Sequence, residues 1–197
     1  MFRMLRGLTL LILAALLGGC GSSPAVRYFA LETIGIEHQR DIDDAPILAI
    51  GPLRVPDYLK RTQMVRRGQG AEVIVDDFNR WAEPLDEAIH RTIASNVDGL
   101  LDNAVVIAFP YGSMLDADYR LHGRIDRLDA DRSGTAILDI QWGIGDGKGT
   151  TVVASRRTRY EAGVTRQDDP AAMAEAISDT IEQLSRDIAT ELDAIVR

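Results

Sequence analysis

The sequence contains one cysteine, Cys20, among its 197 residues. A lone cysteine cannot form a disulfide within the chain, so the stability of the fold must come from its hydrophobic core. With 46% hydrophobic and 26% charged residues, a chain of this length can bury such a core in one globular domain. The same composition excludes a chain that is disordered throughout.

The chain has no excess of positive charge, because it contains 22 basic and 30 acidic residues and its net charge is −8. An acidic surface disfavours nucleic-acid backbones and anionic lipid headgroups as main partners. We therefore expect no nucleic-acid binding. Proteins and apolar molecules stay open as partners.

Motifs for metal or nucleophilic chemistry are missing as well. His38, His90 and His122 stand in separate segments, without a cysteine beside them or an HExxH spacing, so we expect no metal and no cofactor. The sequence has no Gly-x-Ser-x-Gly elbow. The glycine-rich run Gly143–Gly149 lies between two expected strands instead of before a helix, so we interpret it as a hairpin turn and not as a phosphate-binding loop.

The apolar run at the N-terminus, from Leu8 to Leu17, follows Arg3 and Arg6. A membrane-spanning helix needs about 20 apolar residues, so this shorter run is typical of a secretory signal peptide. The run ends in LGGC, residues 17–20, which resembles the bacterial lipobox. In signals of that kind, cleavage occurs just before the cysteine, which then carries the lipid. The alternative is a plain secretory signal with an incidental cysteine.

We therefore predict a lipoprotein signal peptide over residues 1–19 and lipidation of Cys20 with fatty acyl chains such as palmitate. Residues 20–27 are the lipidated cysteine and a tether that reaches at most about 25 Å. Gly21 stands where an aspartate would favour the inner membrane in the usual sorting pattern of lipoproteins. We expect an outer-membrane protein whose single domain, residues 28–197, faces the periplasm.

The predicted domain alternates between strand and helix patterns. Strands are expected at residues 28–31, 47–55, 63–67, 72–75 and 104–109, and in three runs of a meander between 118 and 161. We expect the 47–55 strand to be bent or at an edge near Pro52, and the 104–109 strand to be central. Apolar side chains at helical spacing predict one helix from Pro84 to Leu101 and a long one after Asp169. The expected fold class is α/β or α+β, a mixed β-sheet with two long amphipathic helices.

The stretch DDFNRWAEPLDEAIHRTIASNV, residues 76–97, gathers acids, bases and an aromatic ring around Pro84. Such a group suits general acid–base catalysis. Carboxylates before a helix also complement its unpaired N–H groups. We interpret the stretch as a strand end, a turn sealed by Trp81 and a helix start, with His90 on the flank of the apolar stripe.

Four blocks resemble the PqiC-type lipoproteins, which are auxiliary lipoproteins of ABC-type and MCE-type transport systems. The blocks are GPLRVPDYLKRTQMVRR (51–67), DDFNRWAEPLDEAIHRTIASNV (76–97), DYRLHGRIDRLDAD (118–131) and LSRDIATEL (184–192). The resemblance covers nearly the whole predicted mature chain. It implies a mixed α/β sandwich similar to the N-terminal domain of TolB. It also implies a protein that is not an enzyme, so we assign no catalytic residues.

The resemblance further implies the partners of the chain. The family partner is an MCE-domain protein, anchored in the inner membrane with its permease, that builds a tunnel across the periplasm. Together they move lipids or other apolar molecules between membranes and support envelope integrity. We expect a homo-oligomer that docks this tunnel protein at the outer membrane, with lipid as its cargo.

The predicted docking residues begin in the second half of the expected 47–55 strand and end just before the expected 63–67 strand. They are Pro52, Arg54, Pro56, Tyr58 and Arg61. The segment combines prolines, a tyrosine and basic residues on an acidic protein, which suits an acidic or extended partner segment. The alternative is a structural crossover that is rich in turn residues.

Two other functions compete with docking. A free-standing periplasmic lipid carrier would need its own apolar cavity between helix and sheet. A hydrolase of envelope components would need paired carboxylates with perturbed pKa values, or a contact between a serine and a histidine.

Overall fold

The computed structural model describes residues 24–35, 45–111, 116–148 and 151–196. The predicted signal peptide, Cys20 and the start of the tether lie outside these residues. The boundaries at residues 19 and 27 therefore stay predictions. No helix within the described ranges is long and apolar enough to cross a bilayer.

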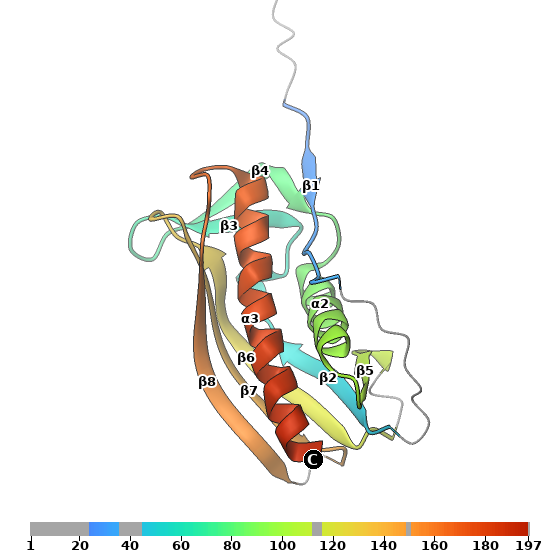
Figure 1. Ribbon diagram of the computed structural model, residues 1–197. Helices are drawn as coiled ribbons and strands as arrows, with labels where there is room; N and C mark the ends of the chain where they lie inside the picture. The colour runs from blue at the N-terminus through green and yellow to red at the C-terminus, as the bar shows by residue number, and fades with distance from the viewer. Residues whose placement is uncertain (1–23, 36–44, 112–115, 149–150, 197) are drawn as a thin grey trace, which may run out of the picture.

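The elements follow one another much as the sequence predicts (Figure 1). In chain order they are β1 (Arg27–Phe29), β2 (Ile47–Arg54), the 3-10 turn η1 (Asp57–Leu59), β3 (Gln63–Arg67), β4 (Val73–Trp81), α2 (Leu85–Leu100), β5 (Val105–Ala108), β6 (Tyr119–Ala130), β7 (Thr135–Asp146), β8 (Val152–Gly163) and α3 (Pro170–Val196). Eight strands form one mixed sheet. The expected α+β class, with two long helices, is confirmed.

The strand β6 organises the sheet. One side of β6 pairs antiparallel with β7, which pairs in turn with β8, so the predicted meander is confirmed. The other side of β6 pairs in parallel with β2 and, at its C-terminal end, with β3. Beyond these, β5 continues the sheet from β2, whereas β4 and β1 continue it from β3. As a result, β1 and β5 stand at opposite ends of the strand order.

The helices α2 and α3 lie side by side on one face of the sheet (Figure 1). The middle of the α3 stripe is buried, whereas Met173 and Ile195 at its two ends are half-buried. Five of its side chains are at most 2% exposed: Ile177, Ile181, Leu184, Ile188 and Leu192. Full burial of one such side chain contributes about 1.5–3 kcal/mol. The Asp169 carboxylate accepts a hydrogen bond from the Ala171 N–H at 3.0 Å and so caps the start of α3.

The prediction that residues 104–109 form a central strand is wrong. Within the described residues β5 pairs with β2 alone and ends the strand order. All four of its residues are half-buried. The helix α2 packs against β5, which explains why an edge strand has an apolar sequence.

The prediction that Asp76 and Asp77 end a strand is also wrong, because β4 continues to Trp81. The Asp76 carboxylate accepts hydrogen bonds from the N–H groups of Phe78 and Asn79 at 2.9 and 3.0 Å. These bonds lie where the pairing of β3 with β4 shifts register, as in a β-bulge. Past the bulge, β4 pairs with β1, and Trp81 is buried in the core.

Candidate docking surface

The predicted docking segment, Pro52–Arg61, starts inside β2, turns through η1 and ends just before β3. The side chains of Pro52, Arg54 and Arg61 are exposed, whereas Pro56 and Tyr58 are half-buried. The Gly51–Pro52 peptide bond is cis. The structure therefore brings two arginines of the segment to the surface and turns the tyrosine toward the sheet.

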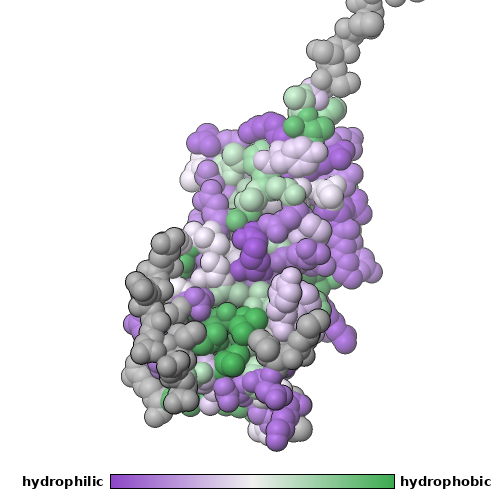
Figure 2. All heavy atoms as spheres, turned by 90° about the vertical axis from the view of Figure 1, so that its right-hand side faces the viewer, coloured by the Kyte–Doolittle hydropathy of each residue, from purple (hydrophilic) through white to green (hydrophobic). Residues whose placement is uncertain are grey.

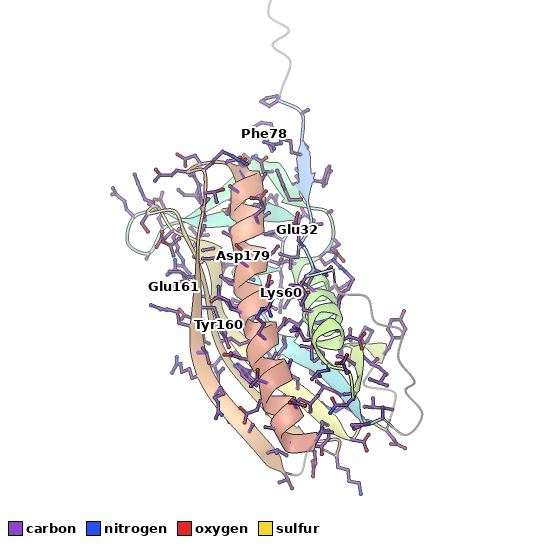
Figure 3. All side chains as sticks on the ribbon, in the orientation of Figure 1. Glu32, Lys60, Phe78, Tyr160, Glu161 and Asp179 are labelled. Atoms are coloured by element: carbon purple, nitrogen blue, oxygen red, sulfur yellow. The ribbon has the colours of Figure 1, made fainter. Side chains whose placement is uncertain are left out.

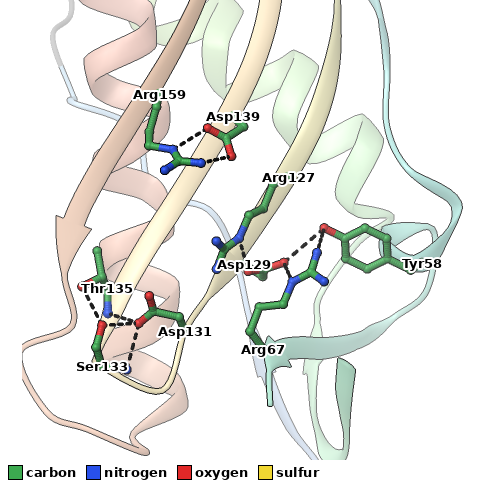
Figure 4. Close-up of polar contacts among 9 residues, drawn as sticks. All are labelled: Tyr58, Arg67, Arg127, Asp129, Asp131, Ser133, Thr135, Asp139 and Arg159. Atoms are coloured by element: carbon green, nitrogen blue, oxygen red, sulfur yellow. Dashed lines mark hydrogen bonds and ion pairs between the residues drawn. The ribbon is translucent and has the colours of Figure 1, made fainter. Parts of the chain in front are cut away.

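Tyr58 belongs to a polar network that fixes the segment to β6 (Figure 4). The Tyr58 hydroxyl donates to Asp129 Oδ2 at 3.1 Å, and Arg67 Nε donates to the same oxygen at 2.9 Å. Arg127 Nε donates to Asp129 Oδ1 at 2.7 Å. Asp129 is only 1% exposed, and two guanidinium groups compensate its buried charge. This network joins η1, β3 and β6.

The environment of Tyr58 favours its neutral form. Burial raises the pKa of the Tyr58 hydroxyl, and the neighbouring Asp129 carboxylate raises it further. The guanidinium of Arg67 also lies over the Tyr58 ring, 5.3 Å from its centroid. Tyr58 thus acts as a hydrogen-bond donor that anchors the segment, and its contact with a partner stays a prediction.

A second anchor comes from His90 on α2. Its Nε2 accepts a hydrogen bond from the Leu53 N–H at 2.8 Å, and its Nδ1–H donates to the Asp86 carbonyl at 2.6 Å. These two partners set the tautomer of the neutral ring. His90 is buried, although the sequence suggested a position on the flank of the helix. Gly51 makes room for the ring, since a Cβ at this position would lie 2.7 Å from the imidazole.

We expect acid to weaken the fold through His90. Burial lowers the pKa of His90 below its ordinary value, so the unfolded chain binds this proton more tightly than the folded chain. The contribution of the neutral ring to stability is present above the ordinary pKa of about 6.5 and is lost as the pH falls below it, by at most about 1.4 kcal/mol per pH unit. Urea unfolding at pH 7.5 and 5.5 measures the loss.

The control is His90→Gln, which keeps a hydrogen-bond acceptor but does not titrate. The wild type should lose more stability between pH 7.5 and 5.5 than this variant, since other titrating groups contribute equally to both. Equal losses in the two proteins would rule out His90 as the cause.

Two of the carboxylates that suggested catalysis, Asp76 and Glu83, have structural partners. Burial alone would raise the pKa of Asp76, but hydrogen bonds from the Asn79 side chain and from two backbone N–H groups outweigh it, so the pKa is lowered. Glu83 pairs with Arg91 of α2. Among the described residues no group of three His, Cys, Asp or Glu side chains could hold a metal ion.

Among the grooves on the surface of the described residues, two bear on the cavity that a lipid carrier would need. One, of ≈ 390 Å³, lies between β3, β4, the β6–β7 turn and the start of α3, and its charged lining includes Arg66, Asp131 and Asp168. The other, of ≈ 580 Å³, lies between the end of α2 and α3 and is lined by Arg186 and Asp193, among others. Side chains of the core fill the space between helices and sheet. Neither groove is the enclosed apolar cavity that a lipid carrier would need.

Comparison with known proteins places the chain among transport lipoproteins. A family model described as "ABC-type transport auxiliary lipoprotein component" matches residues 29–189. The protein "Intermembrane transport lipoprotein PqiC" from Escherichia coli (strain K12) is 27% identical over 186 residues, which cover 93% of this chain and 96% of the relative. The protein of the same name from Shigella flexneri matches to the same extent.

Solved structures show the same fold at lower sequence identity. The crystal structure of an uncharacterized protein superposes with a TM-score of 0.71 at 20% identity, covering 86% of this chain and 99% of the other. A Xanthomonas campestris protein superposes with a TM-score of 0.66 at 17% identity, covering 83% and 92%. At these sequence identities, the two superpositions show a shared fold and nothing about function.

Proposed function

Because the chain belongs to the family of ABC-type transport auxiliary lipoprotein components, we propose that it is the outer-membrane lipoprotein subunit of an MCE/ABC-type intermembrane transport system. The observation that carries this proposal is the family match over residues 29–189, which begins nine residues after the cysteine of the lipobox, Cys20. The name of the Escherichia coli relative supports transport between membranes.

In this proposal a lipid on Cys20 holds the protein at the outer membrane. Residues 1–19 are removed as a signal peptide, residues 20–27 form the lipidated cysteine and its tether, and residues 28–197 fold as one domain. Gly21 favours the outer membrane over the inner one. The domain then faces the periplasm within about 25 Å of the lipid, because seven extended residues span no more than this.

The docking partner in this proposal is the MCE-domain tunnel protein, which reaches across the periplasm from the inner-membrane permease. Arg54 and Arg61 expose positive charge on a chain of net charge −8, so they suit an acidic segment at the end of the tunnel. Tyr58 ties the docking segment to β6, and His90 ties it to α2. A surface that is rigid before binding loses less entropy when the partner arrives.

Docking is tested by reversing the two exposed charges. We expect an Arg54→Glu/Arg61→Glu variant to recover at least about tenfold less MCE-domain protein in a pull-down, a loss of about 1.4 kcal/mol in binding free energy. The matched control is Arg132→Glu/Arg157→Glu, which changes the net charge equally at exposed positions in the β6–β7 turn and β8. Equal recovery with both variants would contradict this docking segment. Failure of the wild type to recover any MCE-domain protein would contradict docking itself.

The proposal also includes a homo-oligomer, which would present several docking segments to one tunnel. Sedimentation of the detergent-solubilised lipoprotein measures its mass. A monomer at the protein concentrations found in the membrane would contradict this part of the proposal.

A further inference from the structure

Three exposed apolar side chains gather where the described chain begins. Tyr28 is 63% exposed, Phe78 is 40% exposed and Val26 is 39% exposed. We call these three residues the β1–β4 patch. Large exposed apolar patches mark sites of protein or membrane contact.

Strand pairing places the patch on one face of the sheet. β1 and β4 run in parallel, with Tyr28 beside Arg80 and Phe29 beside Trp81. Because side chains alternate along a strand, Tyr28 and Phe78 point to one face, while Phe29 and Trp81 point to the other and pack in the core. Val26 precedes Tyr28 by two residues and belongs to the same face.

The patch is held firmly to the domain. The Ala82 N–H donates to the Phe29 carbonyl at 2.7 Å. Just after β1, the Glu32 N–H donates to Ser178 Oγ on α3 at 3.0 Å, and the Ile34 N–H donates to Asn96 Oδ1 on α2 at 3.0 Å. The chain that leaves β1 is therefore tied to both helices, and the patch keeps its orientation relative to the whole domain.

The patch also lies close to the proposed lipid anchor along the chain. β1 is the first element after Cys20, and at most about 25 Å of extended chain separates Cys20 from Arg27. Figure 3 shows Phe78 beside β1, at the end of the molecule where the described chain begins. Figure 2 shows green and pale side chains gathered at the same end. A lipid inserted through Cys20 therefore brings this end of the domain to the bilayer.

We propose that the β1–β4 patch rests in the headgroup region of the bilayer that holds the lipid, and so fixes which way the domain faces. This inference rests on the proposed anchor at Cys20. Tyrosine and other aromatic side chains favour the membrane–water interface, and a lipid chain combined with a second contact anchors a protein more stably than either alone. The contact proposed for these three side chains is apolar, whereas Arg27 and Arg80 beside them can add attraction to anionic lipids. Vesicles of phosphatidylcholine, which has no net charge, therefore test the apolar contact by itself.

Spin labels on single cysteines test the inference. In the lipidated protein the thiol of Cys20 is consumed, so Phe78→Cys and Tyr28→Cys each provide one site for a nitroxide. Phe109→Cys and Tyr111→Cys are matched controls, since Phe109 is 41% exposed and Tyr111 is 71% exposed. Both controls follow β5, at the opposite end of the strand order. The full lipidated protein is placed on phosphatidylcholine vesicles, and power-saturation EPR compares access of oxygen with access of a water-soluble nickel chelate.

We expect the oxygen-to-nickel access ratio to be several-fold higher for labels at positions 28 and 78 than for labels at positions 109 and 111. If the oxygen-to-nickel access ratios at all four positions were equal in protein that still floats with the vesicles, the patch would not contact the bilayer. The lipid anchor at Cys20 would be unaffected by that result. Spin–spin broadening at positions 28 and 78 that disappears on dilution with unlabelled protein would assign the patch to a second copy and overturn the membrane contact. Protein that does not float with the vesicles would overturn the anchor, and this inference with it.

Discussion

Replacing Cys20 by alanine, behind a cleavable secretory signal in place of residues 1–19, should move the protein almost completely from the membrane fraction to the soluble periplasm. Each buried methylene of an acyl chain contributes about 0.8 kcal/mol, so one palmitoyl chain is worth roughly 10 kcal/mol. The β1–β4 patch cannot replace this, because full burial of one large apolar side chain contributes about 1.5–3 kcal/mol and its three side chains are already partly covered. Cell fractionation followed by immunoblotting measures the shift.

The sorting residue gives this experiment its control. Gly21→Asp keeps Cys20 and the native signal, so the protein should stay in the membrane fraction but move to inner-membrane density in a sucrose gradient. A Cys20→Ala protein that still floats with the outer membrane would refute lipid anchoring. A Gly21→Asp protein that stays at outer-membrane density would refute the sorting rule for this chain and leave the anchor intact.

An Asp129→Ala variant should lose about 3 kcal/mol of unfolding free energy, the low end of the range for breaking a buried ion pair. The carboxylate is the shared acceptor of Arg67, Arg127 and the Tyr58 hydroxyl, and its side chain is 2% exposed. Without this carboxylate, the guanidinium groups of Arg67 and Arg127 lie against the sheet with no negative charge to pair with at the former position of Asp129. We choose the low end because the side chains of Arg67 and Arg127 remain 27% and 22% exposed and can reach water. The midpoint of urea unfolding gives the change.

A neighbouring ion pair on the same sheet serves as the control for Asp129. Asp139 accepts two hydrogen bonds from Arg159, at 2.7 and 2.8 Å, but the two side chains are 26% and 56% exposed (Figure 4). Exposed ion pairs contribute about 0–1 kcal/mol, so Asp139→Ala should be mild. Equal losses from Asp129→Ala and Asp139→Ala would show that burial does not set the strength of the first network.

Because Tyr58 belongs to this network, a change at Tyr58 would affect the stability of the fold as well as any contact with a partner. Tyr58→Phe removes one hydrogen bond, worth about 0.5–1.5 kcal/mol, and keeps the ring beneath Arg67. For this reason the docking experiment reverses Arg54 and Arg61 and leaves Tyr58 unchanged. A truncation of Tyr58 would disturb the fold and the docking segment together.

Local patterns predicted those parts of the fold that depend on local physics. The apolar spacing of α3 and the strand pattern of β7 follow from the geometry of one helix and one strand, and both elements form where the sequence predicts them. The predictions for β4 and β5 were wrong for a different reason. Whether β5 is central or at an edge, and whether β4 continues past its bulge, depends on strands that lie far away in the sequence.

The docking segment shows the same division. Its prolines and exposed arginines are visible in the sequence, since exposure of charged residues is the rule. Asp129 and His90 were not predicted as its supports. Asp129 stands 71 residues from Tyr58 and His90 stands 37 residues from Leu53, and no local spacing connects them.

By itself the sequence determined the N-terminal signal pattern ending in Cys20, the two amphipathic helices, the meander and the family, because each depends on the order of neighbouring residues. The tertiary structure alone decided that β5 is an edge strand, that Tyr58 shares a buried carboxylate with Arg67 and Arg127, and that Tyr28 and Phe78 lie on one face beside the tether. The physical reason is that strand pairing and burial depend on segments that are far apart in the sequence. The contacts between these segments stabilise the chain only after the loops between them have closed.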